Sequence, residues 1–201
     1  MARKTNILIE EQRQQTMVEE WKKLDSKILG DFRIFKIRQD TSRSPRTNQE
    51  YDFFILESND WINVIPLTAA GNVVVVYQFR HGTGQVTMEI PGGLVEHGDD
   101  SPAEAARREL LEETGYAADP IIPIGTVAPN PAFLNNRCHT FLALNARPAQ
   151  ALQLDGAEDI HVAEVPLGQI PDLISNGRID HSLVVAAFYH LDRYRQENGH
   201  P

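Results

Sequence analysis

Short apolar runs separated by polar turns occupy the middle of the chain, and this pattern predicts a domain built around a sheet. Two mainly apolar strands are predicted over 60–67 and 72–78, separated by the turn Ala70-Gly71-Asn72. The four valines at 73–76 are continuous rather than alternating, which is typical of a strand that is buried on both faces. Further strands are predicted over 32–38, 50–56, 121–127 and 139–145.

A different period appears near the N-terminus, where apolar residues recur at steps of three and four over 10–29. This spacing is that of one face of a helix. The stripe consists of Met17, Trp21, Leu24 and Ile28. We therefore predict an N-terminal helix, which either packs on the domain through this stripe or docks a partner. Helices are also predicted over 166–175 and 180–191.

The stretch 88–116 predicts a strand, a glycine loop and a helix with a signal at each end. Ser101 is a good N-cap, and Glu104 follows three residues later, as in a capping box. Pro102 falls at the first helical position, where its missing N–H costs nothing. Gly115 stands where a left-handed C-terminal residue is wanted. The helix is therefore expected between Ser101 and Gly115.

One face of this helix is acidic. Glu109, Glu112 and Glu113 are related by steps of three and four, so their carboxylates gather on one side. Like charges repel at this spacing, but Mg²⁺ prefers oxygen ligands and often takes a few carboxylates together with substrate phosphates. A solvated acidic face, with Arg108 as an ion-pair partner, is the alternative interpretation.

These residues resemble the Nudix box, the signature of the Nudix hydrolases. Gly93 matches the first glycine of the pattern, and the stretch 108–116 matches its second half throughout. The middle departs from it, because an aspartate replaces the loop glutamate and the loop is one residue longer. Asp99 has the expected spacing to Gly93, whereas Asp100 has the expected spacing to Arg108. The resemblance implies that one of these two aspartates orients Arg108, and the sequence leaves open which.

The resemblance implies a fold of the α/β class, the Nudix fold. In that fold an α/β/α sandwich surrounds a mixed β-sheet, here with the N-terminal helix and strands appended. We expect a helical appendage over 1–30, a Nudix hydrolase domain over 31–195 and a polar tail over 196–201.

The resemblance also implies an enzyme. Its reaction would be the Mg²⁺-dependent hydrolysis of the diphosphate bond of a nucleoside diphosphate linked to another moiety, with Mn²⁺ as a possible substitute. ADP-ribose and nucleotide sugars are the first candidate substrates. The implied catalytic and metal-binding groups are Glu109, Glu112, Glu113 and the Gly92 carbonyl. The implied structural residues of the box are Gly93, Asp99, Asp100, Arg108 and Gly115.

Candidate substrate-binding residues lie outside the box. Arg80 ends a Gln-Phe-Arg element that resembles one in ADP-ribose pyrophosphatases, and a guanidinium suits bidentate contact with a phosphate. Arg43 and Arg46 lie in the polar loop 40–48, and by the same resemblance they would reach the site of a second subunit in a homodimer. Glu158 lies in an acidic loop, either with an accessory catalytic role or as a solvated turn.

Composition narrows the partners and the compartment. The formal net charge of −9 argues against a nucleic-acid backbone as the principal partner. Cys138 is the single cysteine, so no internal disulfide can form, and a reducing, cytoplasmic setting is the simple expectation. No apolar run is long enough to span a bilayer, so no membrane association is expected. A small phosphorylated molecule and a second copy of the chain remain as partners.

The sequence leaves two other classes of function open besides an enzyme. A Nudix-fold sensor would bind a nucleotide ligand without turnover, although the complete set of Glu109, Glu112 and Glu113 argues against it. A purely structural protein would leave these carboxylates indifferent to metal ions.

Overall fold

The computed structural model describes residues 18–154 and 159–199. The chain divides into two compact units, an N-terminal unit over Met1–Glu57 and a C-terminal unit over Ser58–Pro201.

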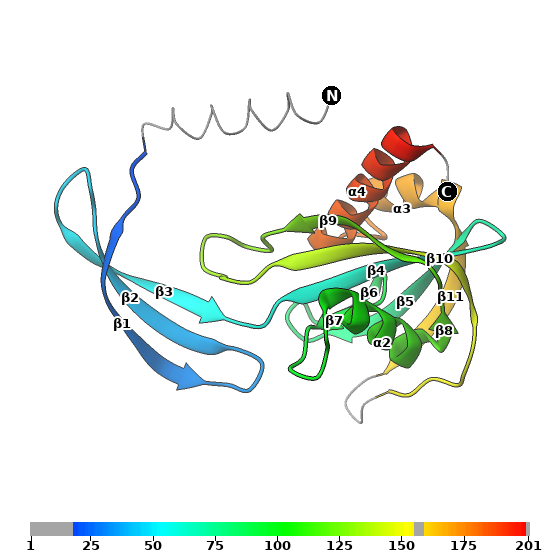
Figure 1. Ribbon diagram of the computed structural model, residues 1–201, viewed down its shortest axis with the longest axis horizontal. Helices are drawn as coiled ribbons and strands as arrows, with labels where there is room; N and C mark the ends of the chain where they lie inside the picture. Colours follow the sequence, from blue (N-terminus) through cyan, green and yellow to red (C-terminus); the bar gives the residue numbers. More distant parts are fainter. Residues whose placement is uncertain (1–17, 155–158, 200–201) are drawn as a thin grey trace. The chain divides into compact units, whose positions relative to one another are not determined.

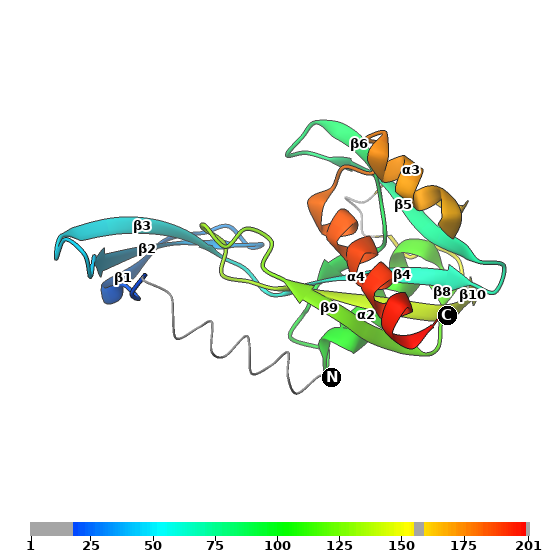
Figure 2. The same cartoon turned by 90° about the horizontal axis from the view of Figure 1, so that it is seen from above.

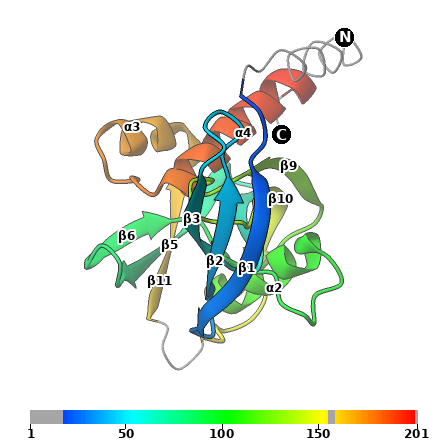
Figure 3. The same ribbon diagram turned by 90° about the vertical axis from the view of Figure 1, so that its left-hand side faces the viewer.

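The described residues of the N-terminal unit form a three-stranded antiparallel sheet in the order β1-β2-β3 (Figure 3). Its strands are β1 (Lys22–Asp31), β2 (Lys36–Arg43) and β3 (Glu50–Glu57). Arg38 of β2 binds the nearly buried carboxylate of Asp40, with its Nε 2.8 Å from Oδ1, and also contacts Glu57 of β3. The ion pair between Arg38 and Glu57 joins β2 to β3 and therefore helps to fix the pairing of these two strands.

The predicted N-terminal helix is wrong wherever the structure describes it, because residues 22–31 form strand β1. Its remaining part, over 10–17, lies outside the described residues. The Trp21 ring instead contacts Tyr51 and Phe53 of β3 edge-on, with ring centroids 5.8 and 5.3 Å apart. Aromatic contacts with a strand distant in sequence thus replace the helical stripe.

The strand predicted over 32–38 begins only at Lys36. Residues 32–35 instead connect β1 to β2, and Arg33 adopts a left-handed backbone with φ of 68°. The division into domains at residues 30 and 195 stays a prediction.

The described residues of the C-terminal unit form an eight-stranded sheet with the central order β11-β5-β4-β10-β8. Strands β6, β7 and β9 pair with β5, β4 and β10 respectively. Because β4 and β10 run parallel while the other pairs are antiparallel, the sheet is mixed. The strands are β4 (Trp61–Thr68), β5 (Asn72–Arg80), β6 (Gln85–Glu89), β7 (Gly92–Leu94), β8 (Tyr116–Ala117), β9 (Ile121–Val127), β10 (Cys138–Pro148) and β11 (Ile160–Pro166).

Helices cover both faces of this sheet. Helix α2 (Pro102–Thr114) lies on one face, and α3 (Ile170–Ser175) and α4 (Ser182–Asn198) lie on the other (Figures 1 and 2). The short 3₁₀ helix η1 (Leu167–Gln169) precedes α3. Among the described residues, no helix combines the length and the apolar character needed to cross a bilayer.

Strand β5 contributes residues to two hydrophobic clusters, one on each face of the sheet. Val73 and Val75 pack in a cluster with Val184 and Leu191 of α4, whereas Val74 packs in a second cluster with residues of α2. All four valines at 73–76 have no exposed surface, which confirms the strand buried on both faces. Full burial of one such side chain is worth about 1.5–3 kcal/mol. The predicted α/β/α sandwich is thereby confirmed.

Helix α2 has the predicted ends. The Ser101 side chain accepts a hydrogen bond from the Glu104 N–H at 3.3 Å. Gly115 adopts φ of 71° and donates its N–H to the Leu111 carbonyl at 2.9 Å. These caps fix where the acidic face of α2 begins and ends.

Candidate active site

Two glycines bring α2 close to the sheet. Strand β7 pairs with β4, with Gly93 opposite Ile62 and Gly92 opposite Asn63. A Cβ atom on Gly92 would lie 2.6 Å from the Ile62 carbonyl oxygen, and one on Gly93 would overlap the Glu109 carboxylate. The missing side chain of Gly92 lets β7 approach β4 closely, and the missing side chain of Gly93 leaves room for the Glu109 carboxylate.

The carboxylates of α2 divide into two groups. Glu113 is only 4% exposed, and its Oε2 accepts a hydrogen bond from the Gly92 N–H at 3.0 Å. Glu109 lies against Gly93. The Glu112 side chain is 40% exposed, and its Oε2 lies 3.1 Å from Nη1 of Arg108. Two of the three predicted carboxylates thus meet at the Gly92-Gly93 pair, and the third lies beside them toward solvent.

Arg108 ties this arrangement together. Its Nε and Nη2 each lie 3.1 Å from an oxygen of Asp99, and Nη2 also donates to the Leu94 carbonyl at 3.0 Å. Its Nη1 lies 2.9 Å from Glu109 Oε1. The Arg108 guanidinium holds the pKa of the Asp99 carboxyl below its ordinary value. Asp99 is therefore the aspartate that orients Arg108 in this structure, whereas Asp100 is exposed.

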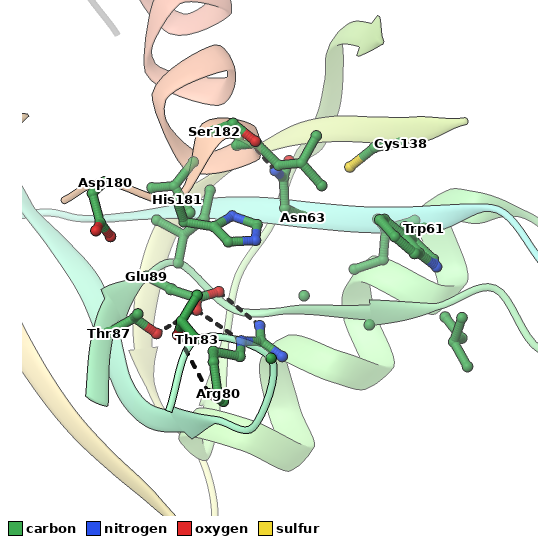
Figure 4. A pocket seen from close by; sticks show the side chains of 18 of the residues that line it. Trp61, Asn63, Arg80, Thr83, Thr87, Glu89, Cys138, Asp180, His181 and Ser182 are labelled. Atoms are coloured by element: carbon green, nitrogen blue, oxygen red, sulfur yellow. Dashed lines mark hydrogen bonds and ion pairs between the residues drawn. The ribbon is translucent and has the colours of Figure 1, made fainter. Parts of the chain in front are cut away.

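Arg80, at the end of β5, is held by a carboxylate that the sequence analysis did not single out. Its Nε and Nη2 lie 2.8 and 2.7 Å from the two oxygens of Glu89, which has only 2% of its surface exposed (Figure 4). Burial alone would raise the pKa of Glu89, but hydrogen bonds from Arg80 and Thr87 outweigh it and hold that pKa below its ordinary value. Glu89 raises the pKa of Arg80, and Glu113 adds to the effect. The guanidinium is thus fixed in one orientation.

A cavity of about 690 Å³ joins these parts. Its wall includes Arg80, Glu89, Gly92 and Gly93. Because Glu109 and Glu113 approach this glycine pair from α2, the cavity and the buried carboxylates share one short stretch of β7. Nη1 of Arg80 hydrogen-bonds to no residue in the described part of the chain, so this edge of the guanidinium is available to a ligand.

The donor set fits a hard divalent cation completed by ligand oxygens. A carboxylate as buried as that of Glu113 needs compensation by hydrogen bonds or positive charge. Within residues 18–154 and 159–199, no three Asp, Glu, His or Cys side chains are arranged to hold an ion by themselves. Mg²⁺ commonly binds through one or two carboxylates together with substrate phosphates. Glu109 and Glu113 match this requirement, whereas a site built from protein ligands alone is not present in that part.

Three predicted site residues are not brought to this cavity by the described structure. Arg43 and Arg46 belong to the N-terminal unit, where Arg43 pairs with Glu50 at 2.6 Å and Arg46 is exposed in the β2–β3 turn. Glu158 lies outside the described residues. Their predicted roles stay predictions.

Sequence reasoning missed Glu89, Asn63 and His181, which all line the cavity. Glu89 had a usable signal, because it is an acidic residue between Met88 and Ile90, in a strand otherwise expected to be buried. A buried charge needs a partner, and the arginine at the end of the preceding strand is the natural one. Asn63 and His181 had no comparable signal, since single polar residues in a strand and before a helix are common.

Comparisons with known proteins agree with this geometry. The family model described as the NUDIX domain matches residues 59–188. The chain is 31% identical over 131 residues to an ADP-ribose pyrophosphatase of Bacillus subtilis, covering 65% of this chain and 70% of the relative. It is 32% identical over 117 residues to a GDP-mannose pyrophosphatase of Yersinia enterocolitica, covering 54% and 60% of the two chains.

The fold has a counterpart among solved structures. The crystal structure of an ADP compounds hydrolase superposes with a TM-score of 0.80 and 18% identity, covering 92% of this chain and 99% of the other. At this identity the likeness establishes the fold alone. Together with the family match and the box residues, it shows that this chain belongs to the Nudix family and is a Nudix hydrolase that resembles the ADP-ribose pyrophosphatase branch.

Proposed function

We propose that this protein hydrolyses the diphosphate bond of a nucleoside diphosphate linked to another moiety, with Mg²⁺ as the metal and Mn²⁺ as a possible substitute. The observation that carries the proposal is the shared stretch of β7. Glu109 and Glu113 reach the Gly92-Gly93 pair from α2, and the same glycines line the cavity that contains Arg80. Acidic groups for a cation and a fixed guanidinium for a phosphate thus serve one space.

The chain's own residues divide the work. Glu109 and Glu113 would hold the metal, with Glu112 and the Gly92 carbonyl as further oxygen ligands. When bound, the metal neutralises phosphate charge and lowers the pKa of the attacking water. Arg80 binds the diphosphate, and Glu89 positions Arg80 through its two hydrogen bonds.

Arg108 and Asp99 affect the reaction only through the residues that they position. Arg108 bonds to Glu109 and Glu112 and also to the β7 carbonyl of Leu94, so it fixes the direction of the acidic face relative to the strand. Asp99 holds Arg108 with both carboxylate oxygens. In the reaction itself, water adds to one phosphorus, the anhydride P–O bond breaks, and two phosphate monoesters leave.

The cavity and the relatives support the choice of substrate class. A space of about 690 Å³ lies within the usual range of pockets that bind small molecules. One relative is named for ADP-ribose and another for GDP-mannose. ADP-ribose and nucleotide sugars are therefore the first substrates to try, and the choice between them belongs to groups outside the box.

Further parts of the proposal concern the assembly. We propose a homodimer formed through the N-terminal strands, in which Arg43 and Arg46 reach the partner's site, and an accessory role for Glu158. The aromatic residues Trp21 and Phe53 are 43% and 41% exposed, which supplies apolar surface for such an interface. A cytoplasmic location is proposed with it, consistent with the buried, unpaired Cys138.

The test is chromatography of phosphate products from a panel of ADP-ribose, GDP-mannose and other nucleotide sugars. Each compound is incubated with Mg²⁺ and, separately, with EDTA. We expect metal-dependent release of a nucleoside monophosphate and a sugar phosphate from at least one of them. Binding of panel members without product in either Mg²⁺ or Mn²⁺ would replace the enzyme with a ligand sensor.

A further inference from the structure

The cavity has a second region, beyond Arg80, that the proposed reaction does not use. It is lined by Asn63 from β4 and by Asp180, His181 and Ser182 at the start of α4. Figure 4 shows these side chains in the same cavity wall as Arg80 and Glu89. Two polar atoms here are buried without a hydrogen-bond partner among the described residues: Oδ1 of Asn63 and Nδ1 of His181.

The Asn63 side chain has a hydrogen-bond partner for only one of its two polar atoms. The residue is 6% exposed, and its Nδ2 donates to the Leu183 carbonyl at 3.1 Å, which fixes the orientation of the amide. The amide oxygen is then left as an acceptor without a donor. A buried acceptor in this state costs free energy unless something supplies a hydrogen bond. The wall of a cavity is where a ligand can supply it.

His181 carries the second of these two buried polar atoms. It occupies the N-cap position of α4, but its side chain makes no capping hydrogen bond. Asp180 does not cap this helix either, because α4 begins at Ser182 after His181. A helix N-cap is usually a residue whose side chain accepts from the first turn, so the His181 side chain is not used for capping.

The charges nearby indicate an uncharged ligand group. Glu89 and Arg80 neutralise each other, and both Glu89 oxygens are occupied, by Arg80 and by Thr87. What remains for a ligand is a fixed amide acceptor and an imidazole nitrogen, beside the Ser182 hydroxyl and the exposed carboxylate of Asp180, which disfavours a phosphate here. Such a pair suits hydroxyl or amino groups, which donate hydrogen bonds without carrying phosphate charge.

We propose that Asn63 and His181 form a recognition subsite for an uncharged, hydrogen-bond-donating part of the substrate. That part is either the hydroxyl-bearing sugar beyond the diphosphate or the nucleoside itself. The inference rests on the proposed function for the identity of the ligand. It adds the residues that distinguish one nucleoside diphosphate derivative from another.

The chain contains a matched control for Asn63. Asn136 is 3% exposed, donates its Nδ2 to the Asn59 carbonyl at 3.0 Å, and likewise leaves Oδ1 buried without a partner in the described part. It does not line the cavity. Asn63→Leu and Asn136→Leu therefore remove the same groups from similar surroundings, one facing the ligand space and one not.

The experiment is titration calorimetry in EDTA, which prevents metal-dependent turnover, with ADP-ribose, ADP and ribose 5-phosphate as probes. We expect Asn63→Leu to weaken ADP-ribose binding by about ten- to hundredfold, the range for a lost buried hydrogen bond, and Asn136→Leu to leave it unchanged. A matching loss for ADP assigns the subsite to the nucleoside. A matching loss for ribose 5-phosphate assigns it to the second sugar.

Equal binding by the two variants would overturn the subsite, as would a wild-type protein that binds none of the three probes. A second pair guards against misfolding of Asn63→Leu: His181→Ala should weaken binding, whereas His190→Ala should not. His190 also lies on α4 with a buried, unpartnered ring nitrogen, but it packs against Gly125 outside the cavity. The binding experiment contains no metal, so it does not depend on turnover. If Asn63→Leu and Asn136→Leu differ in binding but the protein hydrolyses no compound of the panel, the subsite stands and only the proposed reaction is contradicted.

Discussion

Glu89 shows how a single buried charge can organise a binding site. Its carboxylate is almost entirely removed from water and is satisfied by Arg80 and Thr87. Losing one partner of a charged hydrogen-bonded pair costs about 1.5–3 kcal/mol. The pair therefore contributes to stability and also fixes the orientation of Arg80, for which we propose contact with a phosphate.

This pair predicts a pH-dependent stability difference between wild type and Glu89→Gln. The folded-state pKa of Glu89 lies below its ordinary value, which is about 4.3 in an unfolded chain. Its contribution is therefore complete above that value and is lost as the pH falls through the folded-state pKa. We expect urea unfolding to show Glu89→Gln less stable by about 1.5–3 kcal/mol at pH 7, with the difference shrinking toward pH 3. A difference of the same size at both pH values would contradict the depressed pKa.

The two loop aspartates, Asp99 and Asp100, also have different roles in the structure. The sequence could not choose between them, because an inserted residue gives each the family's spacing to one landmark. The choice depends on the fold of the loop, in which Asp99 also accepts a hydrogen bond from the Glu96 N–H at 2.8 Å.

Asp99→Asn should lower turnover by about ten- to hundredfold, the usual effect of losing a group that orients metal ligands. Asp100→Asn, a change at an exposed position, should leave turnover near that of the wild type. Steady-state rates on the preferred substrate, with melting temperatures as a check on folding, decide the point. Equal rates for the two variants would mean that Asp99 does not act through Arg108.

At the scale of elements, α2 and β5 were predictable because their signals are local. Ser101, Pro102 and Gly115 mark the ends of α2 within a few residues, and the valine run alone marks β5. Strand β1 was not predictable, because its apolar positions satisfy a helical period as well. What decides in favour of the strand is pairing with β2 and the contacts of Trp21 with β3, both of which depend on distant residues.

The close approach of β7 and α2 gives a prediction at the same scale. In Gly93→Ala the new methyl group would overlap the Glu109 carboxylate, which lies at the end of a flexible side chain and must move aside. We expect turnover to fall by about tenfold or more, since displacing Glu109 would disturb the proposed cation site. We expect the melting temperature to change little.

Gly98→Ala is the matched control, because a Cβ on this loop glycine meets nothing within 4 Å. It should keep wild-type turnover. If Gly93→Ala keeps wild-type turnover as well, the contact of Glu109 with Gly93 has no catalytic importance.

At the scale of the whole molecule, the family resemblance predicted the sandwich and the position of the acidic helix.

The proposed dimer is tested by sedimentation equilibrium. Wild-type protein should sediment as a dimer, and Phe53→Ser should shift it toward monomer by removing apolar interface area. Phe133→Ser is the control, since Phe133 is equally exposed at 41% but belongs to the C-terminal unit. A monomeric wild type, or equal effects of the two variants, would remove the N-terminal strands as the interface.

The central claim is that the α2 carboxylates at the Gly92-Gly93 pair support metal-dependent hydrolysis. The measurement that tests it most directly is the initial rate of nucleoside monophosphate release in Mg²⁺ by wild type, Glu113→Gln and Glu104→Gln. Glu104 lies on the same helix, but its side chain is 53% exposed. We predict a loss of at least about hundredfold for Glu113→Gln and an unchanged rate for Glu104→Gln. A correctly folded Glu113→Gln protein with the wild-type rate would contradict the account.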